Sequence, residues 1–124
     1  MVSLDGTQEQ MPDELSGGMR KRAALARALA LQPLCILYDE PTTGLDPVTS
    51  HQINVLIRDT QRRFGLTSVV VTHDIASAAY VADRIAFLYD GKILAVGSVE
   101  EMRSSEHPTI REFLSAGPAP VKRT

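Results

Sequence analysis

The sequence has little cysteine, no long apolar run and almost no net charge, and each shortage excludes a class of protein. The single cysteine, Cys35, rules out an intramolecular disulfide and fits a reducing cytoplasm. The longest apolar runs, such as residues 34–38, are far below the ~18–20 residues that a membrane-spanning helix needs. The formal net charge is −2, so no bulk attraction to nucleic acid or anionic lipid is expected. Asp5 and Glu9 interrupt any apolar core near the start, so no secretory signal is expected.

The composition is ordinary for a small folded domain. The chain has 124 residues, of which 44% are hydrophobic and 23% are charged. Residues 1–14 are polar and are expected to be flexible, and residues 117–124, with two prolines and a basic pair, predict a flexible tail. The folded part is therefore expected to cover residues 15–116.

The pattern along the first half of the chain alternates helix and strand. Ser16 can cap a helix that runs to about residue 31, and Asp46 can cap a second helix that begins at Pro47 and ends at Gly65. Between them, residues 34–38 are uninterruptedly apolar, which is typical of a parallel strand covered on both faces. Cys35, inside this run, is expected to be a small buried hydrophobe.

The second half continues the alternation and then changes character. Residues 68–71 predict another buried strand, and Asp74 begins a short helix. Asp90-Gly91 stands between two apolar segments and predicts a hairpin, after which two short helices are expected at residues 99–102 and 108–114. The predicted fold class is α/β, with parallel strands and helices followed by a C-terminal antiparallel hairpin.

Two polar features indicate chemistry on a nucleoside triphosphate. Ser16-Gly17-Gly18 at a helix start presents a hydroxyl and bare backbone N–H groups to an anion, and the helix dipole adds positive potential there. Asp39-Glu40 follows the buried strand, where a carboxylate pair can hold Mg²⁺ and orient a water. No Gly-x-x-x-x-Gly-Lys-[Ser/Thr] phosphate loop occurs anywhere in the sequence.

Four segments resemble, in family order, the motifs of the second half of an ABC-type ATPase. Residues 15–19 (Leu-Ser-Gly-Gly-Met) resemble the signature motif, residues 35–40 the Walker B strand, residues 44–47 the D-loop and residues 71–74 the switch-histidine segment. The resemblance covers nearly the whole chain, and it implies a partial P-loop NTPase fold. The family's phosphate loop and Q-loop lie upstream of anything present here.

The resemblance implies roles for three residues near the strand ends. Glu40 would orient and deprotonate the attacking water, Asp39 would hold Mg²⁺ through water, and His73 would sense the γ-phosphate of ATP. The structural alternative for Asp39 and Glu40 is a helix cap or a solvated acidic pair. For His73 it is a hydrogen bond to a backbone carbonyl.

Four further residues are implied to serve a neighbouring subunit. In this family two ATPase domains pair head to tail, so Ser16, Gly17 and Gly18 would touch ATP held by the other subunit and Asp46 would contact the same interface. A plain helix cap would use Ser16 alone, and it would leave two consecutive glycines unexplained. Asp46 could serve as a helix cap and an interface residue at once.

The narrower resemblance is to a transporter ATPase. Residues 20–28 and 41–47 look like that class, and residues 107–114 resemble the ATPases of bacterial Mla/Mce-type phospholipid transporters. This implies ATP and Mg²⁺ as cofactors, and a second ABC ATPase subunit and a membrane-spanning permease as partners. It also implies a cytoplasmic position, peripheral on the inner face of the cell membrane. Residues 20–22 are basic but lack interleaved aromatic residues, so a solvated helix face is favoured over a nucleic-acid site.

Two functions therefore stay open at the level of sequence. The first is an ATP-binding and ATP-hydrolysing transporter subunit that lacks its phosphate loop and Q-loop as given. The second is a non-catalytic module that completes or blocks the ATP site of a partner subunit. In either case the chain alone is expected to be inactive, because nothing in it grips the β- and γ-phosphates.

Overall fold

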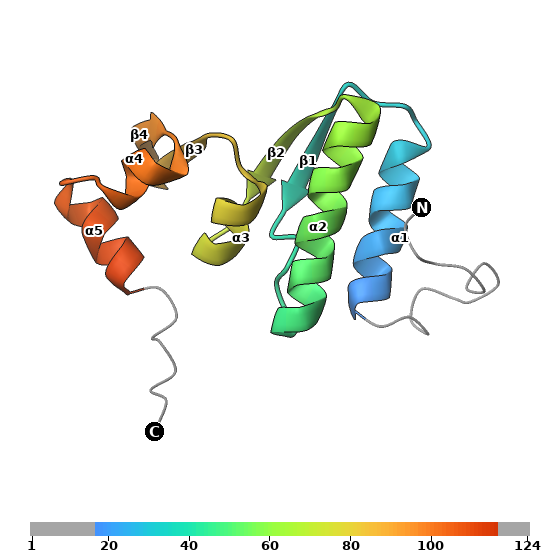
Figure 1. Cartoon of the computed structure of the whole chain (residues 1–124), viewed down its shortest axis with the longest axis horizontal. Coiled ribbons are helices and arrows are strands. Elements are labelled where there is room, and N and C mark those ends of the chain that lie inside the picture. Colours follow the sequence, from blue (N-terminus) through green and yellow to red (C-terminus); the bar gives the residue numbers. More distant parts are fainter. Residues whose placement is uncertain (1–16, 117–124) are drawn as a thin grey trace. The chain divides into compact units, whose positions relative to one another are not determined.

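The computed structural model describes residues 17–116, which form one unit up to His73 and a second unit from Asp74 (Figure 1). Ser16, the flexible stretch predicted at residues 1–14 and the tail predicted at residues 117–124 lie outside the described residues. The two units are described separately below. Within residues 17–116, no helix is long and apolar enough to cross a membrane.

The first unit places two helices beside a pair of parallel strands (Figure 1). Its elements are α1 (Gly17–Leu29), β1 (Cys35–Asp39), α2 (Pro47–Phe64) and β2 (Thr67–Val71). In the parallel register Cys35 lies opposite Thr67, and Asp39 lies opposite Val71. Both strands therefore end at the same edge of the sheet, and the chain segments that follow them meet there.

The core of this unit lies between the helices and one face of the sheet. Leu25 of α1, Ile36 of β1 and Leu66, just before β2, are buried together. Leu29, Tyr38 and Leu56 pack against them. On α2, Ile53 and Ile57 are buried as well, as expected for apolar residues four positions apart on one helix face.

The opposite face of the sheet is open, and this corrects three expectations. Cys35 is exposed, Leu37 is 77% exposed and Val71 is 58% exposed. The predictions that the first strand is covered on both faces, that residues 68–71 form a buried strand and that Cys35 is buried are therefore wrong for the described residues. Alternate residues of a strand point to opposite faces, and α1 and α2 pack on the face that carries Ile36 and Tyr38. An apolar run alone does not reveal that only one face is covered.

The boundaries of α2 follow the predicted capping residues. The Asp46 side chain accepts a hydrogen bond from the Thr49 backbone N–H at 3.0 Å, and Pro47 occupies the first turn. Gly65 ends the helix with φ 62°, a left-handed conformation that glycine adopts without strain. The first helix ends at Leu29, two residues before the predicted end, because the N–H groups of Leu31 and Gln32 bond carbonyls three residues back and the chain tightens into a turn.

The second unit contains a short helix, a hairpin and two more short helices. Its elements are α3 (Ile75–Val81), β3 (Ile85–Tyr89), β4 (Lys92–Gly97), α4 (Val99–Arg103) and α5 (Pro108–Ser115). Asp90 and Gly91 have φ 49° and 73°, which are the two positive values that a type I′ hairpin turn requires. The predicted hairpin is thus confirmed. Phe87 and Phe113 meet edge to face at 5.1 Å and join α5 to the hairpin.

Candidate functional site

The backbone of Glu40 is held in an unusual conformation at the edge where both strands end. Its φ is 49°, a left-handed value that costs a residue other than glycine about 1–3 kcal/mol. The Glu40 N–H donates to the carbonyl of Val71 at 2.7 Å. Its carbonyl accepts hydrogen bonds from the Thr43 N–H at 3.3 Å and from Lys21 Nζ at 3.2 Å. The conformation is therefore set by contacts from β2, α1 and the segment before α2.

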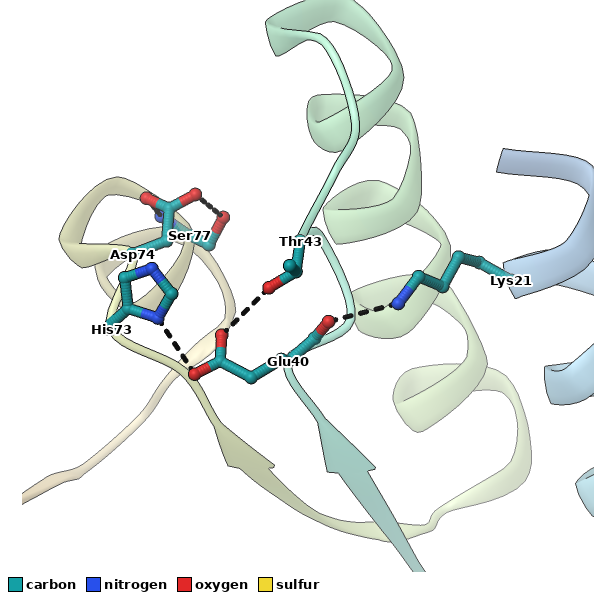
Figure 2. Close-up of polar contacts among 6 residues, drawn as sticks. All are labelled: Lys21, Glu40, Thr43, His73, Asp74 and Ser77. Atoms are coloured by element: carbon teal, nitrogen blue, oxygen red, sulfur yellow. Dashed lines mark hydrogen bonds and ion pairs between the residues drawn. The ribbon is translucent and has the colours of Figure 1, made fainter. Parts of the chain in front are cut away.

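The Glu40 carboxylate is held by two side chains, as Figure 2 shows. Oε1 lies 2.9 Å from Nδ1 of His73, which follows β2, and Oε2 accepts a hydrogen bond from Thr43 Oγ1 at 3.2 Å. The hydrogen bond with His73 is the main cause that lowers the pKa of Glu40. Desolvation opposes it, and the charge on His73 and the Thr43 hydrogen bond lower the pKa further. An ionised carboxylate at a solvent-accessible edge is equipped to accept a proton from water.

Asp39 is the last residue of β1 and is exposed beside Glu40. Among residues 17–116, no three His, Cys, Asp or Glu side chains lie close enough together to hold a metal ion. A water-mediated contact to Mg²⁺ needs only one carboxylate, since nucleotide phosphates and a phosphate loop complete the shell in P-loop enzymes. The position of Asp39 fits that chemistry, and its metal role stays a prediction.

Gly17 and Gly18 begin α1 and pack closely against the start of α2. A Cβ on Gly17 would lie 3.0 Å from Leu45 Cδ2, and a Cβ on Gly18 would lie 2.6 Å from Thr49 Cγ2. Close packing is therefore a structural reason for glycine at position 18 and a weaker one at position 17. A plain helix cap does not supply this reason, but packing does, so the two glycines are no longer evidence for anion binding. Anion binding at this helix terminus stays a prediction. Ser16, the third residue of that predicted contact, is not among the described residues.

Asp46 lies at the start of α2, one residue after Leu45. Its Oδ1 accepts a hydrogen bond from Thr49 Oγ1 at 2.6 Å while Oδ2 accepts from the Thr49 N–H. The Thr49 hydroxyl is the main cause that lowers the pKa of Asp46. The carboxylate is exposed, so capping α2 leaves it accessible to another molecule. The structure thus places Gly18 and Asp46 beside Thr49, and Gly17 beside Leu45, which precedes Asp46.

Two residues of the Glu40 environment were not predicted from sequence. Thr43 follows Glu40 by three residues, a spacing at which a turn brings the hydroxyl back to the carboxylate. The spacing of three residues could therefore have indicated the Thr43–Glu40 hydrogen bond. Lys21 was assigned to a solvated helix face, and no sequence pattern shows that its ammonium reaches a carbonyl 19 residues away.

Replacing Gly18 by alanine should destabilise the fold. Overpacking usually costs about 1–3 kcal/mol, and the better helix propensity of alanine offsets ~1 kcal/mol of that cost. The added methyl meets Thr49 Cγ2, which a β-branched side chain cannot easily move. Adding Thr49→Ser removes this methyl and keeps the hydroxyl that caps α2 with Asp46, so it should restore stability. Urea denaturation measures both changes.

The matched control for this pair is Gly17→Ala. Its new methyl would meet the flexible tip of Leu45 at 3.0 Å, so a smaller effect is expected. If Gly18→Ala were as stable as the parent, or if Thr49→Ser gave no recovery, close packing would not be the reason for glycine at position 18.

Comparisons with known proteins agree with this arrangement. Residues 2–43 match the family model described as ABC transporter. The chain is 44% identical over 124 residues to the intermembrane phospholipid transport system ATP-binding protein MlaF of Escherichia coli K12, covering 98% of this chain and 46% of that protein. It is 43% identical over 115 residues to the probable ribonucleotide transport ATP-binding protein mkl of Mycobacterium tuberculosis H37Rv, covering 93% and 32%. The chain thus spans less than half the length of these curated relatives.

Two solved structures share the fold. A dimeric ATP-binding cassette in a post-hydrolysis state, bound to ADP and Pi, matches with a TM-score of 0.62 and 43% identity, over 71% of this chain and 38% of that one. An ATP-binding cassette of an ABC transporter matches with a TM-score of 0.79 and 26% identity, over 91% and 45%. The predicted fold class, parallel strands with helices plus an antiparallel hairpin, is confirmed by these matches and by the strand pairing.

Proposed function

We propose that this chain provides the hydrolytic carboxylate and the signature helix of an ABC transporter ATP-binding subunit. The premise is its homology, over nearly its whole length, to part of such a protein. The observation that carries the proposal is the Glu40 carboxylate, which His73 and Thr43 hold at the edge where β1 and β2 end. Ligands of parallel sheets bind at this edge.

Each residue at the edge has a distinct task in this proposal. Glu40 orients the attacking water and accepts its proton at a carboxylate that stays ionised at neutral pH. His73 holds that carboxylate through Nδ1 and senses the γ-phosphate. When bound through water to Asp39, Mg²⁺ would neutralise charge on the transferred phosphoryl group. At the start of α1, Gly17 and Gly18 would face ATP held by a second ATPase subunit, together with Ser16 and Asp46.

The hydrolysis proposal is tested by comparing two lengths of the protein. The extended form is this chain preceded by a phosphate-loop segment, taken from the genomic reading frame or, where that frame holds none, from E. coli MlaF. The 124-residue chain alone should release no phosphate from Mg-ATP above background, since it lacks a backbone cradle and lysine for the β- and γ-phosphates. The extended form should release phosphate. An extended form without turnover, or a chain active alone, would contradict the proposal.

The start of α1, which packs against the segment that the exposed Asp46 caps, supports a second candidate function. In that case the chain is a non-catalytic module that completes or blocks the ATP site of a partner. Mixing the chain with an intact ATPase subunit separates the two functions. A stoichiometric change in the partner's turnover, abolished by Gly18→Ala together with Thr49→Ser, would support the module.

The role proposed for the extended form is to power phospholipid movement through a membrane-spanning permease, to which it binds on the cytoplasmic face of the membrane. The similarity to MlaF, whose name gives phospholipid transport, supports it, and so do residues 107–114. Affinity capture of the extended form from membranes of its own cell should recover a polytopic permease. The Glu40→Gln form, which should hold nucleotide longer, is expected to recover more of it. Recovery of only ribosomes or DNA-repair factors would rule out the transport role.

A further inference from the structure

Lys21 connects the helix that begins at Gly17 with the backbone of Glu40. It lies one turn into α1, and its side chain extends from that helix toward Glu40 (Figure 2). The ammonium donates a hydrogen bond to the Glu40 carbonyl at 3.2 Å in a partly buried setting. Its neighbour Arg22 is directed elsewhere, because Nη2 of that guanidinium donates to Gln52 Oε1 at 2.9 Å. Of these two neighbouring cations, only Lys21 is bonded to the candidate site.

The conformation of Glu40 explains why a cation at its carbonyl matters. With φ at 49°, the left-handed backbone aims the carboxylate at His73. A change to an ordinary negative φ would rotate the side chain away from this partner. The hydrogen bond from the Glu40 N–H to the Val71 carbonyl, at 2.7 Å, fixes the peptide plane before Glu40. The peptide plane after Glu40 is therefore the one that can still rotate. A charged donor bonds that carbonyl more strongly than the 3.3 Å bond from the Thr43 N–H does.

We infer that Lys21 is a positioning residue for Glu40, which keeps the left-handed backbone and thereby the aim of the carboxylate. This rests on the proposed function, since it gives Glu40 the hydrolytic role. The competing explanation is that Lys21 only ties α1 to the segment after β1. A mere tie would affect stability, whereas a positioning residue also affects turnover and its pH dependence.

Turnover in the extended form distinguishes these explanations. Lys21→Met keeps the length of the side chain and removes the donor, so kcat should fall about tenfold while KM for ATP changes by less than about twofold. Lys21→Arg keeps a charged donor and should recover most of the loss. Arg22→Met is the matched control, one position along the same helix, and should turn over like the parent.

The pH profile supplies a readout that a structural tie would not move. His73 and Thr43 lower the pKa of Glu40, so a misdirected carboxylate loses both and its pKa rises toward the ordinary value. The acid limb of kcat should therefore shift to higher pH in Lys21→Met and stay in place in Arg22→Met. Among residues 17–116, the side chains that bond Glu40 are those of His73, Thr43 and Lys21 itself.

The backbone itself can be followed independently of activity. A positive φ brings the amide and Hα protons of Glu40 close together, so their strong intraresidue NOE should weaken in Lys21→Met and persist in Lys21→Arg. If Lys21→Met matches Arg22→Met in kcat, acid limb and NOE while Glu40→Gln is inactive, the positioning role is wrong and the proposed function stands. If Glu40→Gln turns over like the parent, the proposed function is wrong. If Glu40→Gln is active and the NOE of Lys21→Met is also unchanged, the inference is wrong as well. If Glu40→Gln is active but the NOE of Lys21→Met is weakened, Lys21 determines the backbone conformation of Glu40 and has no role in turnover.

Discussion

Replacing Glu40 by glutamine in the extended form should lower ATP hydrolysis by about 10²-fold or more, the typical contribution of a general base. Glutamine keeps the volume of the side chain and can still bond His73 and Thr43, but it cannot accept a proton. ATP should still bind, and the nucleotide-bound dimer should persist because turnover no longer dissolves it. Phosphate release measures the loss, and light scattering with Mg-ATP measures the dimer.

The control and the pH dependence make this test specific. Asp59→Asn removes an exposed carboxylate from α2 in the same unit and should leave turnover unchanged. The folded pKa of Glu40 is lowered, mainly by His73, so the base is ionised above that pKa and is lost as pH falls through it. Hydrolysis should therefore survive to a pH below the ordinary range of a glutamate. Equal turnover by Glu40→Gln and the parent would show that Glu40 is not the base.

The parts of the fold that local chemistry determines could be predicted from the sequence. Asp46 and Gly65 set the ends of α2, and Asp90-Gly91 sets the hairpin turn, because each depends on a residue and its immediate neighbours. The meeting of Glu40 and His73 could also be anticipated. Both residues follow strands that turned out to be parallel, and parallel strands end at one edge.

The remaining features depend on distances between segments, which a single sequence does not contain. The hydrogen bond from Lys21 to Glu40 exists only because α1 packs beside the end of β1. The reason for Gly18 is a methyl group of Thr49, 31 positions later, and helix propensity gives no hint of it. The exposure of Cys35 depends on which face of the sheet the helices cover, and an apolar run is compatible with either face.

The open face of the β1–β2 sheet has a consequence for the 124-residue chain on its own. Leu37, Val69 and Val71 are 77%, 47% and 58% exposed on this sheet. Full burial of such a side chain is worth about 1.5–3 kcal/mol, so covering all three is a strong driving force for association. The sheet also has only two strands among the described residues, which leaves backbone N–H and C=O groups unpaired along its edges.

We therefore expect the isolated chain to self-associate, or to melt broadly at low temperature, because parallel strands need cover on both faces. Leu37→Lys should shift it toward monomer by placing a charge in the middle of the open face. The control Leu31→Lys changes a side chain that is 84% exposed but lies in the turn after α1, so it should leave the association unchanged. Size-exclusion chromatography with light scattering, beside thermal melting, separates the outcomes. A sharp cooperative melt from a clean monomer at high concentration would contradict the expectation, because it would mean that one covered face is enough to hold these two strands.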